Sequence, residues 1–329
     1  MPRQHLRILC CIGLLVASGW TCDQVSAQAP LKKLRLGIAA TSVGFLPIYA
    51  AHQKGFYRDE GIDLEIILMS LAAANNAFFK NEIDYSAGLT GLALAAARNY
   101  PAKILIFTVA KPLQSFVSRK EIKEPRDLKG KKVAGSSPGG SATILAYQAL
   151  KHFGLEPGKD VQVLPMGGSG AGRLAVLEQG VVDAALLSVP ENIIAVNKGY
   201  NELIFLGDVV SFPQNGFGTS VTRIQQQPDE VYRMVRATLR GLLFVTDEAN
   251  REQARDIMMK QWRVSDQKLA AEMLGFLKRG LAKDAVIAPQ AVQYFIDLTR
   301  ETSNVTQPIS GAQVVDFSFL EKARKELVR

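Results

Sequence analysis

The run Lys54-Gly55-Phe56-Tyr57-Arg58-Asp59-Glu60-Gly61-Ile62-Asp63-Leu64 joins a helix-like segment to a strand-like segment. The residues 47–54 at its start have a helical pattern that should end at Gly55, because glycine commonly follows the last turn of a helix. The residues 62–68 at its end are mostly apolar and rich in isoleucine and leucine, which favours a short buried strand. The run therefore predicts one unit of alternating helix and strand, and the neighbouring sequence continues the pattern.

Strand-like and helix-like segments alternate on both sides of this run. In the first part we expect strands at 34–39, 62–68, 85–88, 103–109 and 112–118, and helices at 47–54, 72–80 and 91–98. A charged, turn-rich stretch at 121–132 leads to a second set, with strands at 132–135, 161–165, 183–187 and 203–206 and helices at 141–153, 171–179 and 191–197. Such alternation predicts βαβ units and largely parallel sheets, so the fold class is α/β.

The last third of the chain is almost wholly helical. Helices are expected at 229–248, 251–262, 266–280 and 290–299 and from Phe319 onward, with Ser265 as an N-cap. We therefore divide the chain into residues 28–117 as the first part of lobe 1, 118–212 as lobe 2, and 213–329 as a mostly helical return to lobe 1.

The N-terminus has the features of a cleaved signal peptide. Arg3, His5 and Arg7 precede an apolar run at 8–20, which is shorter than the about 20 residues that a membrane span needs. Val25-Ser26-Ala27 fits the small-residue cleavage site, so residues 1–27 are predicted to be removed and the protein to be periplasmic. An uncleaved anchor and a lipid on Cys22 are the alternatives.

The composition argues against several classes of protein. All three cysteines (Cys10, Cys11 and Cys22) lie in the predicted leader, so the mature chain has no thiol for a disulfide, a metal or a nucleophile. Two histidines then remain, and we expect neither a metal site nor a cofactor. The formal charge is +8, but lysine and arginine alternate with aspartate and glutamate without a basic block, so we expect no nucleic-acid partner.

Three motifs in order carry a resemblance to a known family. Residues 54–64 are similar to the run KGFF-x-x-EGL-x-V, residues 127–134 (DLKGKKVA) to the entry of the second lobe, and residues 179–185 (QGVVDAA) to the lead-in of a later strand. Together they resemble the nitrate, sulfonate and taurine receptors, a family that also includes receptors for the pyrimidine half of thiamine.

The resemblance implies a periplasmic-binding-protein fold of type II. In this fold two α/β lobes are joined by a two-strand hinge, the helical C-terminal segment packs on lobe 1, and the lobes close on a ligand in the cleft. It also implies a small-molecule ligand and an ABC permease and ATPase as importer partners. We expect the protein itself to be a monomer.

The ligand should lie at the carboxyl ends of the strands, where open α/β sheets bind their ligands. The loops at these ends are rich in glycine and hydroxyl groups, and several begin helices, whose free N–H groups can bind polar or anionic groups. The candidate ligand-binding residues in these loops are Thr41, Ser42, Phe45, Leu46, Gly88, Thr90, Ser136, Ser137, Gly139, Gly140, Ser141, Gly168, Ser169, Ser188 and Glu191. Asn215 is a further candidate, because it lies near the expected return crossing between the lobes.

Several of these residues have a plain structural alternative. Ser137 or Ser141 could only cap a helix, which serine often does. Phe45 and Tyr85 could stack on a ligand ring or belong to the core. Arg173 is expected to be a solvated helix residue rather than a ligand contact. Glu191 would repel an anion, pair with a ligand amine, or form a salt bridge with the transporter.

No pair of nucleophile and base is apparent in the sequence, so we expect a receptor and not an enzyme. The ligand is expected to be a small polar or anionic organic molecule: a sulfonate, a carboxylate or a pyrimidine-like compound. The first alternative is an enzyme similar to the thiamine-pyrimidine synthases. Those enzymes have an active-site histidine in the first loop, where this chain has Thr41 and Ser42, and a cysteine-rich iron motif, whereas the predicted mature chain has no cysteine. The second is a ligand-sensing partner of a membrane protein.

Overall fold

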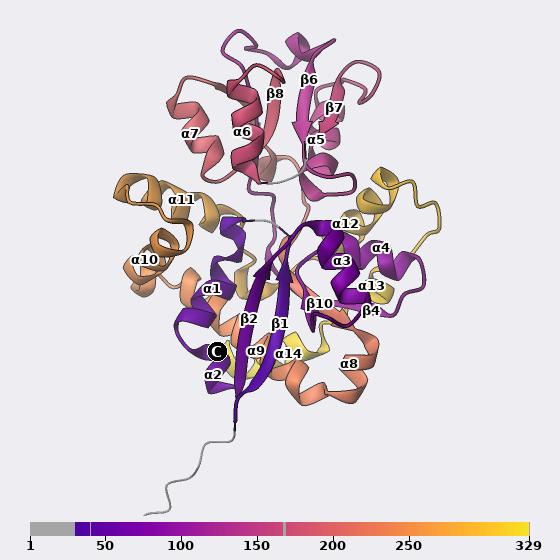
Figure 1. The fold of residues 1–329 in the computed structure, drawn as a ribbon, viewed down its shortest axis with the longest axis vertical. Coiled ribbons are helices and arrows are strands. Elements are labelled where there is room, and N and C mark those ends of the chain that lie inside the picture. The colour runs from indigo at the N-terminus through magenta and orange to yellow at the C-terminus, as the bar shows by residue number, and fades with distance from the viewer. Residues whose placement is uncertain (1–29, 40, 167–168, 329) are drawn as a thin grey trace, which may run out of the picture. The chain divides into compact units, whose positions relative to one another are not determined.

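The computed structural model describes residues 30–39, 41–166 and 169–328, so the predicted signal peptide lies outside the described residues. All the elements below belong to one contact unit, Leu31–Arg329. They form two five-stranded sheets with helices around each (Figure 1). This confirms the predicted α/β class and the two-lobed arrangement.

The first sheet has the strand order β2-β1-β3-β10-β4. Its strands are β1 (Lys32–Ile38), β2 (Ile62–Leu68), β3 (Tyr85–Ser86), β4 (Ala102–Val109) and β10 (Gln214–Ser220). The first three run parallel, and β10 is antiparallel to both β3 and β4. The strand β10 returns to this sheet from the second lobe, and the parallel edge places the carboxyl ends of β1 and β3 side by side.

The second sheet has the order β7-β6-β8-β5-β9. Its strands are β5 (Gln114–Ser118), β6 (Lys132–Gly135), β7 (Gln162–Pro165), β8 (Ala184–Ser188) and β9 (Asn201–Phe205). The strand β5 is antiparallel to β8 and β9, so it belongs to the second sheet, whereas the sequence analysis placed residues up to 117 in lobe 1. The first crossing between the sheets therefore precedes β5 and does not follow it.

The helices of the two lobes alternate with the parallel strands. They are α1 (Leu46–Gln53), α2 (Phe56–Asp59), α3 (Leu71–Phe79) and α4 (Leu89–Ala97) in the first lobe, and α5 (Ser141–His152), α6 (Gly170–Glu178) and α7 (Glu191–Asn197) in the second. Gly55 and Gly61, on either side of α2, have φ angles of 78° and 74°, a region that favours glycine. These two turns bring the chain from α1 back into β2, which explains both glycines of the opening run.

The return segment forms the helices of the last third of the chain. They are α8 (Val221–Gln226), α9 (Pro228–Thr246), α10 (Arg251–Trp262), α11 (Gln267–Gly280), α12 (Pro289–Thr302), α13 (Gly311–Val314) and α14 (Ser318–Leu327). Short 3-10 turns lie at Val43–Phe45, Pro125–Leu128, Leu206–Asp208, Glu248–Asn250 and Lys283–Ala285. The residue that caps α11 is Asp266, whose Oδ1 accepts hydrogen bonds from the backbone N–H groups of Lys268 (2.8 Å) and Leu269 (3.1 Å), and not the expected Ser265.

Helices α9 and α14 cover one face of the first sheet (Figure 1), where Val231, Leu239 and Leu320 join the core of the strands. The helical tail therefore packs on lobe 1, as expected. Helices α11 and α12 also contact α7 and α5 of the second lobe. None of the described helices is both long and apolar enough to cross a membrane.

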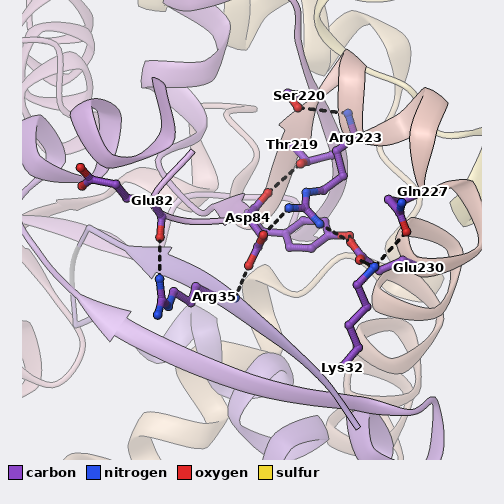
Figure 2. A network of polar contacts seen from close by, with 10 residues as sticks. Lys32, Arg35, Glu82, Asp84, Thr219, Ser220, Arg223, Gln227 and Glu230 are labelled. Atoms are coloured by element: carbon purple, nitrogen blue, oxygen red, sulfur yellow. Dashed lines mark hydrogen bonds and ion pairs between the residues drawn. The ribbon is translucent and has the colours of Figure 1, made fainter. Parts of the chain in front are cut away.

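A polar network ties the first strand to the helical tail (Figure 2). The carboxylate of Glu230 on α9 lies 2.5 Å from Lys32 Nζ and accepts a hydrogen bond from Arg223 Nη1 (2.6 Å). Arg223 also pairs with Asp84, which accepts a hydrogen bond from the backbone N–H of Arg35 (2.7 Å). The network fixes β1 and the start of β3 against α8 and α9, away from the loops that form the site.

Candidate ligand-binding site

A cavity of about 520 Å³ lies where the loops of the two sheets face each other. Residues after β1 and β3 line it from the first lobe, and residues after β6 and at the end of β8 line it from the second. Of the predicted residues, the lining contains Thr41, Ser42, Phe45, Gly88, Thr90, Ser136, Ser137, Gly140, Ser141, Ser169, Ser188 and Asn215. The rule that ligands bind at the carboxyl ends of strands thus identified residues that the fold brings together.

Several lining serines complete local backbone structure. Ser42 Oγ accepts a hydrogen bond from the N–H of Gly44 (3.2 Å), and Ser169 Oγ caps α6 by accepting one from Gly172 (3.3 Å). At α5 the N-cap is Gly140, without a side-chain cap, so neither Ser137 nor Ser141 caps this helix. Ser136 Oγ instead accepts a hydrogen bond from the N–H of Thr143 (3.3 Å).

Among the described residues, three of the predicted ones do not line the cavity. Leu46, the first residue of α1, is fully buried in a core cluster with Val43 and Val109 and is absent from the lining. Gly139 has a φ of 71° and lies against Ser303, the residue that follows α12. The Glu191 carboxylate lies against Gly170, and Glu191 is absent from the lining. Gly168 lies outside the described residues.

Arg173 lines the cavity, although the sequence analysis expected it to be solvated. Its exposed fraction is 4%, and its Nε donates a hydrogen bond to the carbonyl of Leu186 on β8 (2.6 Å). Burial lowers the pKa of Arg173, and the nearby Glu191 carboxylate opposes that shift. The packing of α6 against β8 buries this side chain, and such packing is not visible in the local sequence.

The Glu191 carboxylate has a structural role at the start of α6. It accepts a hydrogen bond from the backbone N–H of Ala171, and burial raises its pKa although Arg173 and backbone N–H groups act in the opposite direction. A carboxylate at this position is favourable because the first N–H groups of a helix carry partial positive charge. The protein thus supplies its own acidic group both to the N-terminus of α6 and to Arg173.

The rest of the lining is mainly apolar, with amides at the crossings between the sheets. Phe212 and Phe295 line it with ring centroids 5.0 Å apart, and Leu68–Ala72 lines it from the first lobe. Two glutamines, Gln114 and Gln214, line it from the first residues of β5 and β10. Neither glutamine was predicted, although the neighbouring Asn215 was, because the other candidates came from loops at the carboxyl ends of strands. Within the described lining, Arg173 is the one ionisable side chain.

The comparisons place the chain in a family. Residues 42–251 match the family model described as "NMT1/THI5 like", and the chain belongs to this family, which confirms the expected resemblance. Among curated proteins, the chain is 26% identical over 246 residues to the riboflavin-binding protein RibY of Chloroflexus aurantiacus, covering 71% of this chain and 68% of the relative.

Solved structures share the fold. The putative sulfonate ABC transporter protein SsuA of Methylobacillus flagellatus KT, a periplasmic sulfonate-binding protein, has a TM-score of 0.70 at 16% identity, covering 90% of this chain and 95% of that chain. The desulfurization enzyme DszB has a TM-score of 0.65 at 18% identity, covering 89% and 99%. At these identities the two structures show the fold, which is therefore compatible with both binding and catalysis.

Proposed function

We propose that this protein is the periplasmic solute receptor of an ABC importer and that the cavity binds its ligand. The observation that carries the proposal is a cavity lined by both lobes whose described lining has hydroxyls, amides and apolar groups but one ionisable side chain, Arg173. Such a lining suits the binding of a molecule by shape and hydrogen bonds. General acid–base chemistry would need a carboxylate, histidine or similar group within reach of the ligand.

The family and the fold support the proposal. Periplasmic sulfonate-binding SsuA has the same two-lobed fold, and the curated relative RibY binds riboflavin. The two crossings between the sheets are suited to act as a hinge, so that closure buries the ligand and presents both lobes to a permease. We take the ligand to be an organic molecule, since a cavity of about 520 Å³ is within the usual range for drug-sized ligands.

The second candidate function is an enzyme on the same fold, and the likeness to DszB favours it. The two functions differ in the fate of the ligand. A receptor releases the molecule that it bound, whereas an enzyme releases a different one.

The test uses protein secreted to the periplasm of an expressing bacterium, with a panel of alkanesulfonates, nitrate, pyrimidines and riboflavin. We expect at least one compound to raise the melting temperature and to titrate with one site per chain in calorimetry. Mass spectrometry should recover the bound compound unchanged. Binding of none of the panel, or recovery of a converted product, would overturn the proposal.

A pair of variants locates the site. Ser188→Trp places a large ring in the cavity and should abolish the ligand-induced rise in melting temperature. Ser265→Trp makes the same change at an exposed position beside α11 and should retain it. Equal binding by both variants would place the ligand elsewhere.

A further inference from the structure

Asn215 has an unusual backbone conformation for its place in the fold. It is the second residue of β10, directly after the chain has crossed from the second lobe, and its φ angle is 53°. The other described asparagines with a positive φ follow the C-caps of α3, α4 and α12, where a left-handed residue is common: Asn81, Asn99 and Asn304. Left-handed residues away from helix ends cluster at ligand-binding sites.

The carboxamide of Asn215 is available to a ligand. Asn215 lines the cavity and is partly exposed. Other asparagine amides form bonds within the protein: Asn201 Nδ2 donates to the carbonyl of Ile122 (2.8 Å), and Asn192 Nδ2 donates to Ser115 Oγ (3.0 Å). No described residue forms such a bond with the Asn215 carboxamide, whose polar atoms remain accessible.

Gly44 lies against this carboxamide. It is a buried residue of the 3-10 turn Val43–Phe45, and a Cβ atom added to it would lie 2.6 Å from Asn215 Cγ. Real Cβ atoms do not approach other atoms so closely, so the carboxamide can occupy its position because residue 44 is glycine. Gly44 is absent from the described lining, so it can act on a ligand only through Asn215.

Both sides of this contact are held in place. The N–H of Gly44 donates to Ser42 Oγ (3.2 Å), and its carbonyl accepts a hydrogen bond from Thr108 Oγ1 of β4 (3.3 Å). The pairing of β10 with β4 on either side of Asn215 fixes the backbone of that residue. The turn, β4 and β10 all belong to the first lobe, so a movement of the second lobe should leave the carboxamide where it is.

A purely conformational role for Asn215 is the alternative. Asparagine adopts a positive φ more readily than most residues, so it would suit this turn of the backbone without any ligand. A fixed carboxamide, however, offers a ligand a donor and an acceptor that need little ordering, which lowers the cost of binding. Glycine separates the two roles, because it adopts the same φ without a carboxamide.

We propose that the Asn215 carboxamide is a hydrogen-bonding anchor for the ligand and that Gly44 is the positioning residue that holds it in place before the ligand arrives. This inference rests on the proposed receptor function. The affinity of the cavity then depends on Gly44, a residue that does not touch the ligand.

The first test removes the carboxamide and keeps the backbone. Asn215→Gly is titrated by calorimetry with riboflavin, uracil, ethanesulfonate and nitrate. We expect it to melt close to the parent and to bind at least tenfold more weakly each probe that the parent binds. Asn99→Gly, the same change at the left-handed position that follows the C-cap of α4, is the matched control and should bind like the parent.

The second test uses the contact between Gly44 and Asn215. Gly44→Ala should weaken the binding of the same probes, because the added methyl group displaces the carboxamide. In the Asn215→Gly background the methyl group has room, so Gly44→Ala should cause no further loss of affinity there. Such a difference between the two backgrounds measures the coupling of the two residues, which a glycine with only a structural role would not show in binding.

The outcomes separate this inference from the receptor function. Binding by Asn215→Gly that equals the parent's overturns the inference and leaves the receptor function standing. An equal loss of affinity from Gly44→Ala in both backgrounds overturns the positioning role of Gly44. If the parent binds none of the four probes, both proposals fail. If Asn215→Gly does not fold, Asn215→Asp, which keeps the size and tolerates the same φ, replaces it, and an unchanged Kd of that variant overturns the inference.

Discussion

At the scale of single residues, the buried ionised groups have distinct roles at the site and in the first lobe. Arg173 and Glu191 hold α6 beside the cavity, whereas Glu230 is the centre of the network that ties β1 to the helical tail (Figure 2). The Glu230 side chain is 5% exposed and accepts hydrogen bonds from Arg223 and from Tyr85 (3.0 Å). A buried carboxylate with this many donors makes stability depend on pH.

Glu230 is expected to lose its contribution to stability in acid. Burial alone would raise the pKa of Glu230, but hydrogen bonds from Lys32 and Arg223 outweigh burial and lower it below the ordinary value of 4.5. The contribution is therefore complete above pH 4.5 and is lost as the pH falls through the lower pKa of the folded state. Glu230→Gln should reduce the free energy of unfolding at pH 7 by about 2 kcal/mol.

Urea unfolding at pH 7 and at several values below pH 4.5 measures this effect. The difference between Glu230→Gln and the parent should shrink as the pH is lowered. Glu321→Gln, at an exposed position on α14, is the control and should differ little from the parent at any pH. A difference for Glu230→Gln that is constant with pH contradicts the argument.

At the scale of elements, the sequence predicted most segments but not their partners. The strand at 62–68 and the glycines beside α2 were identifiable because periodicity and turn chemistry are local. The sheet to which β5 belongs depends on its pairing with β8 and β9, which lie about 70 or more residues further along the chain. In the same way, Phe295 reaches the cavity from α12, which is far along the chain from the predicted loops. The burial of Arg173 likewise depends on how α6 packs against β8.

The start of α6 gives a matched test of such packing. A Cβ atom at Gly170 would collide with the Glu191 carboxylate, so Gly170→Ala should displace it and lower the free energy of unfolding by about 1–3 kcal/mol. At Gly172, two residues later in the same helix, the nearest atom to such a Cβ is Ser169 Oγ at 4.0 Å. Gly172→Ala should therefore raise stability by about 0.5–1 kcal/mol, because alanine favours helix more than glycine does.

Urea unfolding of the two alanine variants at pH 7 compares them directly. The expected result is opposite signs from the same chemical change in one helix. Destabilisation by both variants would mean that α6 tolerates no added methyl group. Stabilisation by both would mean that the Glu191 carboxylate moves away at little cost.

At the scale of the whole unit, the two crossings are not the only links between the lobes, because side chains of the helical tail also contact the second lobe. Arg279 on α11 lies 4.2 Å from the ring centroid of Phe205, and its Nη2 is 3.2 Å from Asp208 Oδ1. Near α12, Lys151 Nζ lies 2.6 Å from Glu301 Oε1. Since Phe205 and Lys151 belong to the second lobe and the helices pack on the first, these contacts favour a closed arrangement without touching the cavity.

Arg279→Ala is expected to weaken ligand binding by shifting the protein toward an open form. The ion pair with Asp208 is exposed and contributes little, whereas the stacking of the guanidinium on Phe205 contributes about 0.5–1 kcal/mol. A loss of that size reduces the fraction of the binding-competent form and should raise the apparent Kd by up to about fivefold. Small-angle scattering should show a larger radius of gyration for the ligand-free variant and the parent value once ligand saturates it.

The control for this prediction is Arg251→Ala, which removes an exposed ion pair with Glu248 in the α10 region and no contact to the second lobe. It should leave both the apparent Kd and the scattering unchanged. A rise in Kd for Arg279→Ala without any change in the ligand-free radius would mean that the arginine acts on the cavity itself. Because Arg279 lies outside the described lining, that result would contradict coupling through closure and would require a path from α11 to the ligand.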